Sequence, residues 1–166
     1  MPASSLRRRR AAVYVFGGLS LLGLAFFFGC SAIAEDDVFR TAEVDLSPMA
    51  AMVAPDSVMN NAFAYIDQHQ GCFVVPVEGE DMMPRYPKGT ALIVYPTDFT
   101  TLKRGMTVVY AKHGGGRIAH VLTLQTAEGW ATRGFNSQTD DPETVTAGNY
   151  LGTVTMAFAP STEGTN

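Results

Sequence analysis

The longest stretch without a charged side chain runs from Ala11 to Ala34 and separates a short N-terminal tail from the part of the chain that can form a folded domain. As a helix, these 24 residues would span roughly 36 Å at about 1.5 Å per residue, which is enough to cross a bilayer. Arg7 to Arg10 precede the stretch, and Asp36-Asp37 follow it. Positive charge stays on the cytoplasmic side of a membrane segment. We therefore expect a basic cytoplasmic tail at 1–10, a single membrane anchor at 11–34, and a domain beyond it on the extracytoplasmic side of the cell membrane.

Two other interpretations of the same segment stay open. Ala32-Ile33-Ala34 matches the small-x-small pattern of a signal-peptide cleavage site, which would make the segment a removable export signal. Gly29-Cys30-Ser31 resembles a lipoprotein site with Cys30 as the lipidated residue, although bulky Phe27 and Phe28 precede it. The length favours an uncleaved anchor, because the apolar core of an export signal usually runs only about 7–15 residues. All three interpretations deliver the same domain to the same side of the membrane.

The charge of the remaining chain narrows the class of partner. Beyond Ala34 it carries 8 basic and 16 acidic residues. Such an acidic excess argues against binding to nucleic acid, which needs a basic surface.

Residues 35–72 predict a linker that ends in a short helix. Its first part mixes acids, Pro48, Pro55 and small apolar residues without a clear period. Asp56-Ser57 can cap a helix that runs to Gln70 and is closed by the glycine that follows.

From Cys72 onward the texture changes to short β-branched or aromatic runs separated by Gly, Pro and Asp. This pattern is typical of strands joined by turns, and the runs are too evenly spaced for βαβ units. We expect a mainly β domain over 73–158 and a flexible tail at 159–166. About six strands are expected in that domain, at 73–77, 90–95, 106–111, 118–124, 129–133 and 150–158.

Between the first two expected strands the chain reads Gly79-Glu80-Asp81-Met82-Met83-Pro84, followed by Lys88-Gly89-Thr90. This segment resembles the nucleophile box of the type I signal peptidase family, where a strand ends in Gly-x-Ser-Met-x-Pro and a Gly-Asp turn leads into the next strand. The resemblance places Asp81 at the nucleophilic serine and Thr90 at the turn aspartate.

Three later segments resemble the same family in the same order. Residues 103–109, Lys-Arg-Gly-Met-Thr-Val-Val, are similar to its Arg-Gly-Asp-hydrophobic strand. Residues 117–122, Arg-Ile-Ala-His-Val-Leu, are similar to its general-base strand, and His120 matches the endoplasmic-reticulum and archaeal type rather than the lysine of bacterial members. Residues 132–141 are similar to its Lys-Gly-Asp-Asn-Asn-x-x-Asp-Asp segment, with Phe135 in place of the first aspartate. Four ordered blocks are far more specific than one box, and they imply the signal-peptidase β fold.

The resemblance also implies roles for the site residues. His120 would be the general base, Asp141 the carboxylate that orients it, and position 81 the nucleophile. A serine hydroxyl attacks an acyl carbon once an imidazole accepts its proton. The carboxylate of Asp81 is a much weaker nucleophile than an alkoxide, and an ion pair with His120 would spoil the imidazole as a base. We therefore expect no serine-type hydrolysis. The other assigned residues of the box, expected to contact the bound segment, are Gly79, Met82, Met83 and Pro84.

No cofactor is expected, and the sequence spacing of His120, Asp81 and Asp141 gives no support for a metal site. A second branch that shares the Gly-x-Ser-Met box, the self-cleaving repressors, uses lysine as the base and carries a DNA-binding domain. The histidine, the membrane segment and the acidic chain argue against that branch here.

Three functions follow from these features. The favoured one is an impaired relative that binds an extended segment of an exported polypeptide, such as a signal peptide, by strand addition along its cleft. The second is a working endopeptidase for exported proteins, in which Asp81 and Asp141 activate a water molecule or in which Ser137 or Thr139 is the nucleophile. The third is a structural envelope domain without cleft chemistry.

Overall fold

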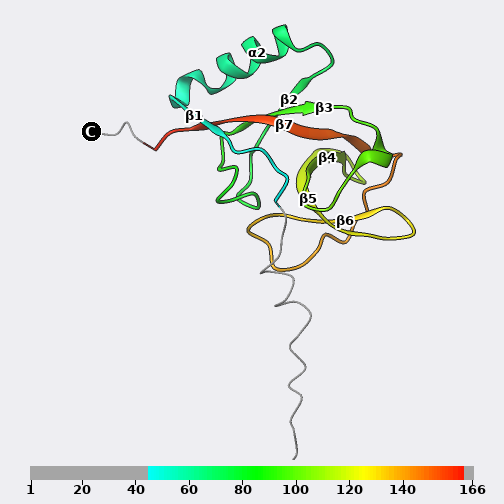
Figure 1. Cartoon of the computed structure of the whole chain (residues 1–166). Coiled ribbons are helices and arrows are strands. Elements are labelled where there is room, and N and C mark those ends of the chain that lie inside the picture. Colours follow the sequence, from blue (N-terminus) through cyan, green and yellow to red (C-terminus); the bar gives the residue numbers. More distant parts are fainter. Residues whose placement is uncertain (1–44, 163–166) are drawn as a thin grey trace, which may run out of the picture.

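The computed structural model describes residues 45–162 (Figure 1). The basic tail at 1–10, the expected membrane segment at 11–34 and the first part of the expected linker lie outside this range. Within residues 45–162, no helix is long and apolar enough to span a membrane.

The described domain is built around one seven-stranded, largely antiparallel sheet with the order β2-β3-β7-β4-β5-β6, and β1 pairs with β7 outside this path (Figure 1). The strands are β1 (Ala51–Val53), β2 (Phe73–Pro76), β3 (Ala91–Tyr95), β4 (Thr107–Ala111), β5 (Arg117–Gln125), β6 (Trp130–Arg133) and β7 (Tyr150–Pro160). The helices are η1 (Pro55–Ser57), α2 (Val58–Gln68) and η2 (Phe99–Thr101). The prediction of a mainly β domain with one short helix is confirmed, and each expected strand corresponds to one of β2 to β7.

Two ends of the domain differ from the prediction. Strand β1 lies within the expected linker and pairs in parallel with the end of β7, Ala51 opposite Phe158 and Val53 opposite Pro160. The same pairing carries β7 into the expected flexible tail, and Ala159 is fully buried. A three-residue strand is too short to show periodicity. Because β1 was not predicted, the last two residues of β7, which pair with it, were not predicted as strand either.

Helix α2 begins and ends slightly differently from the sequence expectation. Ser57 is its N-cap residue, but its hydroxyl donates to the carbonyl of Ala54 rather than capping the helix. The helix ends at Gln68, and Gly71 takes a positive φ of 86° in the turn into β2. A residue with a Cβ is strained in that conformation, which explains the glycine at this point.

Alternating side chains of β3 divide the core between the two faces of the sheet. Ala91 and Ile93 point toward α2, where they pack with Val58, Ala62 and Phe158. The neighbouring residues of β3 face the other way, into a cluster that also holds three residues of the β2–β3 loop. That second cluster contains Val75, Val77, Met82, Tyr86, Leu92, Val94, Val109, Val121, Val154 and Ala157.

Strands β2 and β5 each leave an edge without a strand partner in the described sheet. Strand β2 pairs only with β3. Strand β5 pairs with β4 from Arg117 to Val121, but β6 joins its other side only from Val121 onward. Residues 117–120 therefore present one unpaired edge.

Candidate active site

The loop between β2 and β3 carries Asp81 on a turn that the core holds in place. Met82 is only 3% exposed and Tyr86 is fully buried, and both pack into the cluster beneath the sheet. The hydroxyl of Tyr86 also donates to the carbonyl of Pro48, 2.6 Å away. Because its neighbour Met82 points inward, Asp81 is left exposed at the surface of the turn.

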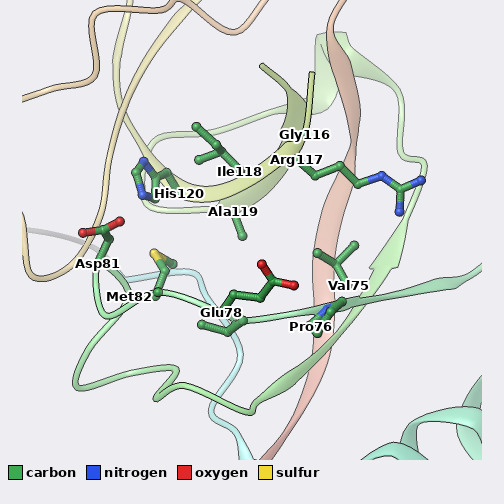
Figure 2. A pocket seen from close by; sticks show the side chains of 12 residues that line it. Val75, Pro76, Glu78, Asp81, Met82, Gly116, Arg117, Ile118, Ala119 and His120 are labelled. Carbon is green, nitrogen blue, oxygen red and sulfur yellow. The ribbon is translucent and has the colours of Figure 1, made fainter. Parts of the chain in front are cut away.

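A cavity of about 390 Å³ opens between the β2 side of this loop and the first half of β5 (Figure 2). Asp81 and His120 both line it, and Figure 2 shows them at the end away from Arg117. The full lining is Val75, Pro76, Val77, Glu78, Gly79, Asp81, Met82, Gly116, Arg117, Ile118, Ala119 and His120. The structure thus brings two of the three predicted catalytic positions to one cavity.

His120 is a buried residue of β5, 7% exposed, and its Nδ1 atom lies 2.6 Å from Oδ2 of Asp141. Asp141 follows β6, where its backbone N–H donates to the carbonyl of Thr132 at 2.7 Å. An ionised carboxylate only accepts hydrogen bonds, so Nδ1 is the donor, and in the neutral imidazole Nε2 is then the acceptor. This is the tautomer that a histidine general base requires.

Two further side chains hold the same carboxylate oxygen. The hydroxyl of Thr132 donates to Oδ2 of Asp141 at 2.7 Å, and the hydroxyl of Tyr110 donates to it at 3.2 Å. Burial by itself would raise the pKa of Asp141, but the hydrogen bonds from His120 and Thr132, with the charge of His120 and the Tyr110 hydroxyl, together lower it. Asp141 is therefore held ionised beside the imidazole.

Tyr110 is affected in the opposite direction. Burial raises its pKa to about 12, and the nearby carboxylates of Asp141 and Glu143 act in the same sense. The phenol thus keeps its proton and serves as a hydrogen-bond donor to Asp141 at physiological pH.

Asp81 lies next to this pair without joining it. No hydrogen bond or ion pair links its side chain to His120 in the described chain, so the ion pair considered from the sequence is not formed. Unlike serine, aspartate offers no hydroxyl group that an adjacent imidazole could turn into an alkoxide. The resemblance to signal peptidases predicts a nucleophile at this position, and the sequence has a carboxylic acid side chain there.

The loop after β6 fixes the backbone of Asp81. The N–H of Asn136 donates to the carbonyl oxygen of Asp81 at 2.8 Å. A Cβ on Gly134 would lie 2.5 Å from the same oxygen, so only glycine allows this approach. Phe135, which departs from the family pattern, packs edge-on against Tyr86 with ring centroids 6.3 Å apart. An apolar side chain at this position thus joins the two loops through the core.

Of the other residues predicted to contact a bound segment, two line the cavity and two do not. Gly79 and Met82 line it, whereas Met83 and Pro84 are exposed outside it. Thr90 is fully buried and donates to the carbonyl of Pro87.

Neither alternative nucleophile, Ser137 or Thr139, lies in the cavity lining. Residues 45–162 contain no group of three or more His, Cys, Asp or Glu side chains arranged to hold a metal ion.

Sequence reasoning missed Tyr110, Thr132 and Asn136, the partners that hold Asp141 and Asp81. Thr132 is the first residue of one of the segments that resemble signal peptidases, and this position was the only sequence signal that it belongs to the site. Tyr110 stands in an apolar strand, where an aromatic residue is expected as core.

A cleft bordered by strands, with a carboxylate-oriented histidine beside a tight turn, defines a peptidase-like β domain. Residues 42–149, well over half of the chain, match the family described as Peptidase S24-like, and the chain therefore belongs to the Peptidase S24-like family. No curated protein matches the chain. The coarse resemblance to a peptidase is confirmed, and the assignment to the type I, histidine-type branch stays a prediction.

Proposed function

We propose that this domain binds an extended segment of an exported polypeptide in the cleft between β2 and β5, and that it does not hydrolyse the segment by a serine mechanism. One observation carries the proposal. The unpaired edge of β2 and the unpaired edge at 117–120 of β5 border the same cavity, which ends at Asp81 and His120. Unpaired strand edges bind extended peptides through main-chain hydrogen bonds.

The chemistry of the cleft supports binding over hydrolysis. The contact of 2.6 Å between Nδ1 of His120 and Oδ2 of Asp141 supports the roles of base and orienting carboxylate. The nucleophile is missing, because a carboxylate at position 81 attacks an amide far more weakly than a serine alkoxide would.

An aspartic mechanism is also disfavoured. It needs two carboxylates that share one proton. Oδ2 of Asp141 accepts hydrogen bonds from His120, Thr132 and Tyr110. Asp141 is also not among the residues that line the cavity. Asp141 is thus committed to orienting the imidazole and is poorly placed to activate a water molecule with Asp81.

The proposal includes the location of the domain. Residues 11–34 anchor the chain in the cell membrane, and the acidic domain lies on the extracytoplasmic side, where exported polypeptides emerge. The charge distribution around the uncharged stretch supports this orientation. A reporter enzyme fused after Asn166 should be active if it works only outside the cytoplasm. Activity of a reporter restricted to the cytoplasm would contradict the orientation.

The deciding experiment compares the full-length native chain with Asp81→Ser and Asp81→Asn, using a fluorogenic peptide that carries an exported-protein cleavage site. All three proteins should bind the peptide, as measured by fluorescence anisotropy. Only Asp81→Ser should cleave it, because only a hydroxyl supplies a proton for His120 to accept. Asp81→Asn is the matched control for the loss of charge without gain of a nucleophile.

The other outcomes separate the remaining functions. Cleavage by the native chain that disappears in His120→Ala would establish a working endopeptidase. If none of the proteins binds any exported-protein segment, the structural envelope domain becomes the better description.

A further inference from the structure

We propose that Glu78 selects a basic side chain, Lys or Arg, at one position of the segment that binds in this cleft. The inference rests on the proposed function and specifies the substrate class of the same site. The alternative substrate class is a segment made only of small apolar residues, which a cleft without charged side chains would favour.

The backbone places Glu78 firmly at the wall of the cavity. The preceding residue, Val77, donates its N–H to Thr90 at 2.8 Å and accepts from the N–H of Gly89 at 2.9 Å. Glu78 itself is exposed, and its carboxylate points across the cavity toward β5 (Figure 2). The wall on that side includes Ala119, a small side chain that leaves room for a long one from the ligand.

No cation of the described chain satisfies this carboxylate. Glu78 forms no hydrogen bond or ion pair within residues 45–162. Arg117 also lines the cavity, but its guanidinium lies over the ring of Phe73, 5.6 Å from the centroid, and Figure 2 shows it pointing away from Glu78. Asp81 adds a second carboxylate to the same lining. The cavity therefore presents negative charge to a bound segment, which favours a cation there.

The rest of the lining suits the stem of a long basic side chain. Val75, Val77 and Met82 form an apolar floor beside Glu78. Lysine and arginine bury their methylene groups on such surfaces while the charged end meets a carboxylate. A smaller apolar residue would leave Glu78 without a partner in the complex.

The preference should belong to one position of the segment. In an extended chain, side chains alternate in direction and advance by about 3.3 Å per residue. Once main-chain pairing with β2 and β5 sets the register, a single residue of the segment faces Glu78.

The test uses the full-length chain in detergent and a set of labelled, uncharged peptides of one sequence in which a single Lys is moved along the chain. Each Lys peptide is paired with the Gln peptide for the same position, and affinity is measured by fluorescence anisotropy. We expect one position at which Lys improves affinity by about fivefold, the size typical of a partly exposed ion pair. The gain should shrink as salt is added.

Variants of the protein identify the carboxylate responsible. Glu78→Gln should abolish the gain, and Glu78→Lys should make a Glu peptide the better ligand at the same position. Glu80→Gln is the matched control, because it removes the same charge from the same loop outside the cavity lining. It should keep the gain.

Failure of this inference and failure of the proposed function give different results. Equal binding of Lys and Gln peptides at every position, or an equal loss of the gain in Glu80→Gln, overturns the role of Glu78 while peptide binding stands. Absence of binding for every peptide to the native chain overturns the proposed function itself, and the role of Glu78 with it.

Discussion

The Nδ1 atom of His120 lies 2.6 Å from Oδ2 of Asp141, and sheet register puts two more donors on the same oxygen. His120 belongs to β5, Tyr110 to the neighbouring β4, and Thr132 to β6 on its other side. Three adjacent strands thus converge on one carboxylate. The orientation of the imidazole is fixed by the sheet and does not depend on the residue at position 81.

Replacing Asp141 with Asn should change the acid stability of the domain. The pKa of Asp141 is lowered in the folded state, because the hydrogen bonds to its ionised form outweigh burial. Its contribution to stability is therefore fully present above the unfolded pKa of about 3.9 and is lost as the pH falls through the lower folded value. We expect the native chain to lose more stability than Asp141→Asn below about pH 4, measured by urea unfolding at a series of pH values.

Asp140→Asn is the control for this measurement. Asp140 precedes Asp141, its side chain is 43% exposed, and it forms a long ion pair of 3.7 Å with Arg133. Its replacement should leave the acid-induced loss of stability close to that of the native chain. Equal pH profiles for Asp141→Asn and the native chain would contradict the assigned role of Asp141.

Thr132→Val should weaken the same network without changing its shape. Valine removes the hydroxyl that donates to Asp141 at 2.7 Å and leaves a side chain of similar volume in a fully buried position. A hydrogen bond to a charged group contributes about 1.5–3 kcal/mol, so we expect a loss of that order in the free energy of unfolding. Thr132→Ser keeps the hydroxyl and should lose less, and the idea fails if Ser is as damaging as Val.

Gly134→Ala should displace the turn that carries Asp81. The added Cβ would lie 2.5 Å from the carbonyl oxygen of Asp81, which is backbone and cannot rotate away. Overpacking of this kind costs about 1–3 kcal/mol, and thermal or urea unfolding measures it. In the Asp81→Ser background, any peptide cleavage should fall as well, because the serine moves relative to His120.

Gly148→Ala is the matched control for this substitution. The nearest atom to a Cβ at Gly148 is the hydroxyl oxygen of Thr146 at 3.7 Å, an ordinary contact. Stability and cleavage should both stay near the parent values. If Gly134→Ala behaves like Gly148→Ala, the close approach to Asp81 is not needed.

Two buried tyrosines should titrate late and make the domain sensitive to alkali. Burial raises the pKa of both Tyr86 and Tyr110 to about 12. Because the unfolded chain releases these protons near pH 10, stability should fall as the pH rises from about 10 to about 12. Ultraviolet absorbance of phenolate in the folded protein should show a late transition near pH 12 with the amplitude of two tyrosines. Tyr86→Phe and Tyr110→Phe should each remove half of this amplitude, and a late amplitude of fewer than two tyrosines in the native chain would contradict the assignment.

The strands were predictable from the sequence because their signals are local. The runs at 91–95 and 107–111 carry β-branched residues between Gly, Pro and Asp, and each became a strand within one residue of its expected start. Strand β1 was missed because three residues show no period, and its existence depends on a partner about a hundred residues later.

The pairing of His120 with Asp141 was predictable from the sequence, whereas the residues that hold the pair were not. His120 and Asp141 were identified through segments that resemble signal peptidases, and the structure brings them into contact. The converging donors Tyr110 and Thr132 depend on which residues of neighbouring strands lie opposite each other. That register follows from the packed sheet rather than from any short motif.

Strand β7 is last in the described sequence but central in the sheet, where it pairs with β1, β3 and β4. On one side of β7 lie β2 and β3, and on the other side lie β4, β5 and β6. Until Tyr150–Pro160 has left the ribosome, no strand joins these two parts of the sheet. The domain must therefore fold late in synthesis, through contacts between residues far apart in the chain, which makes folding comparatively slow. If the chain is exported as proposed, this late folding would leave it unfolded, as passage through a translocation channel requires.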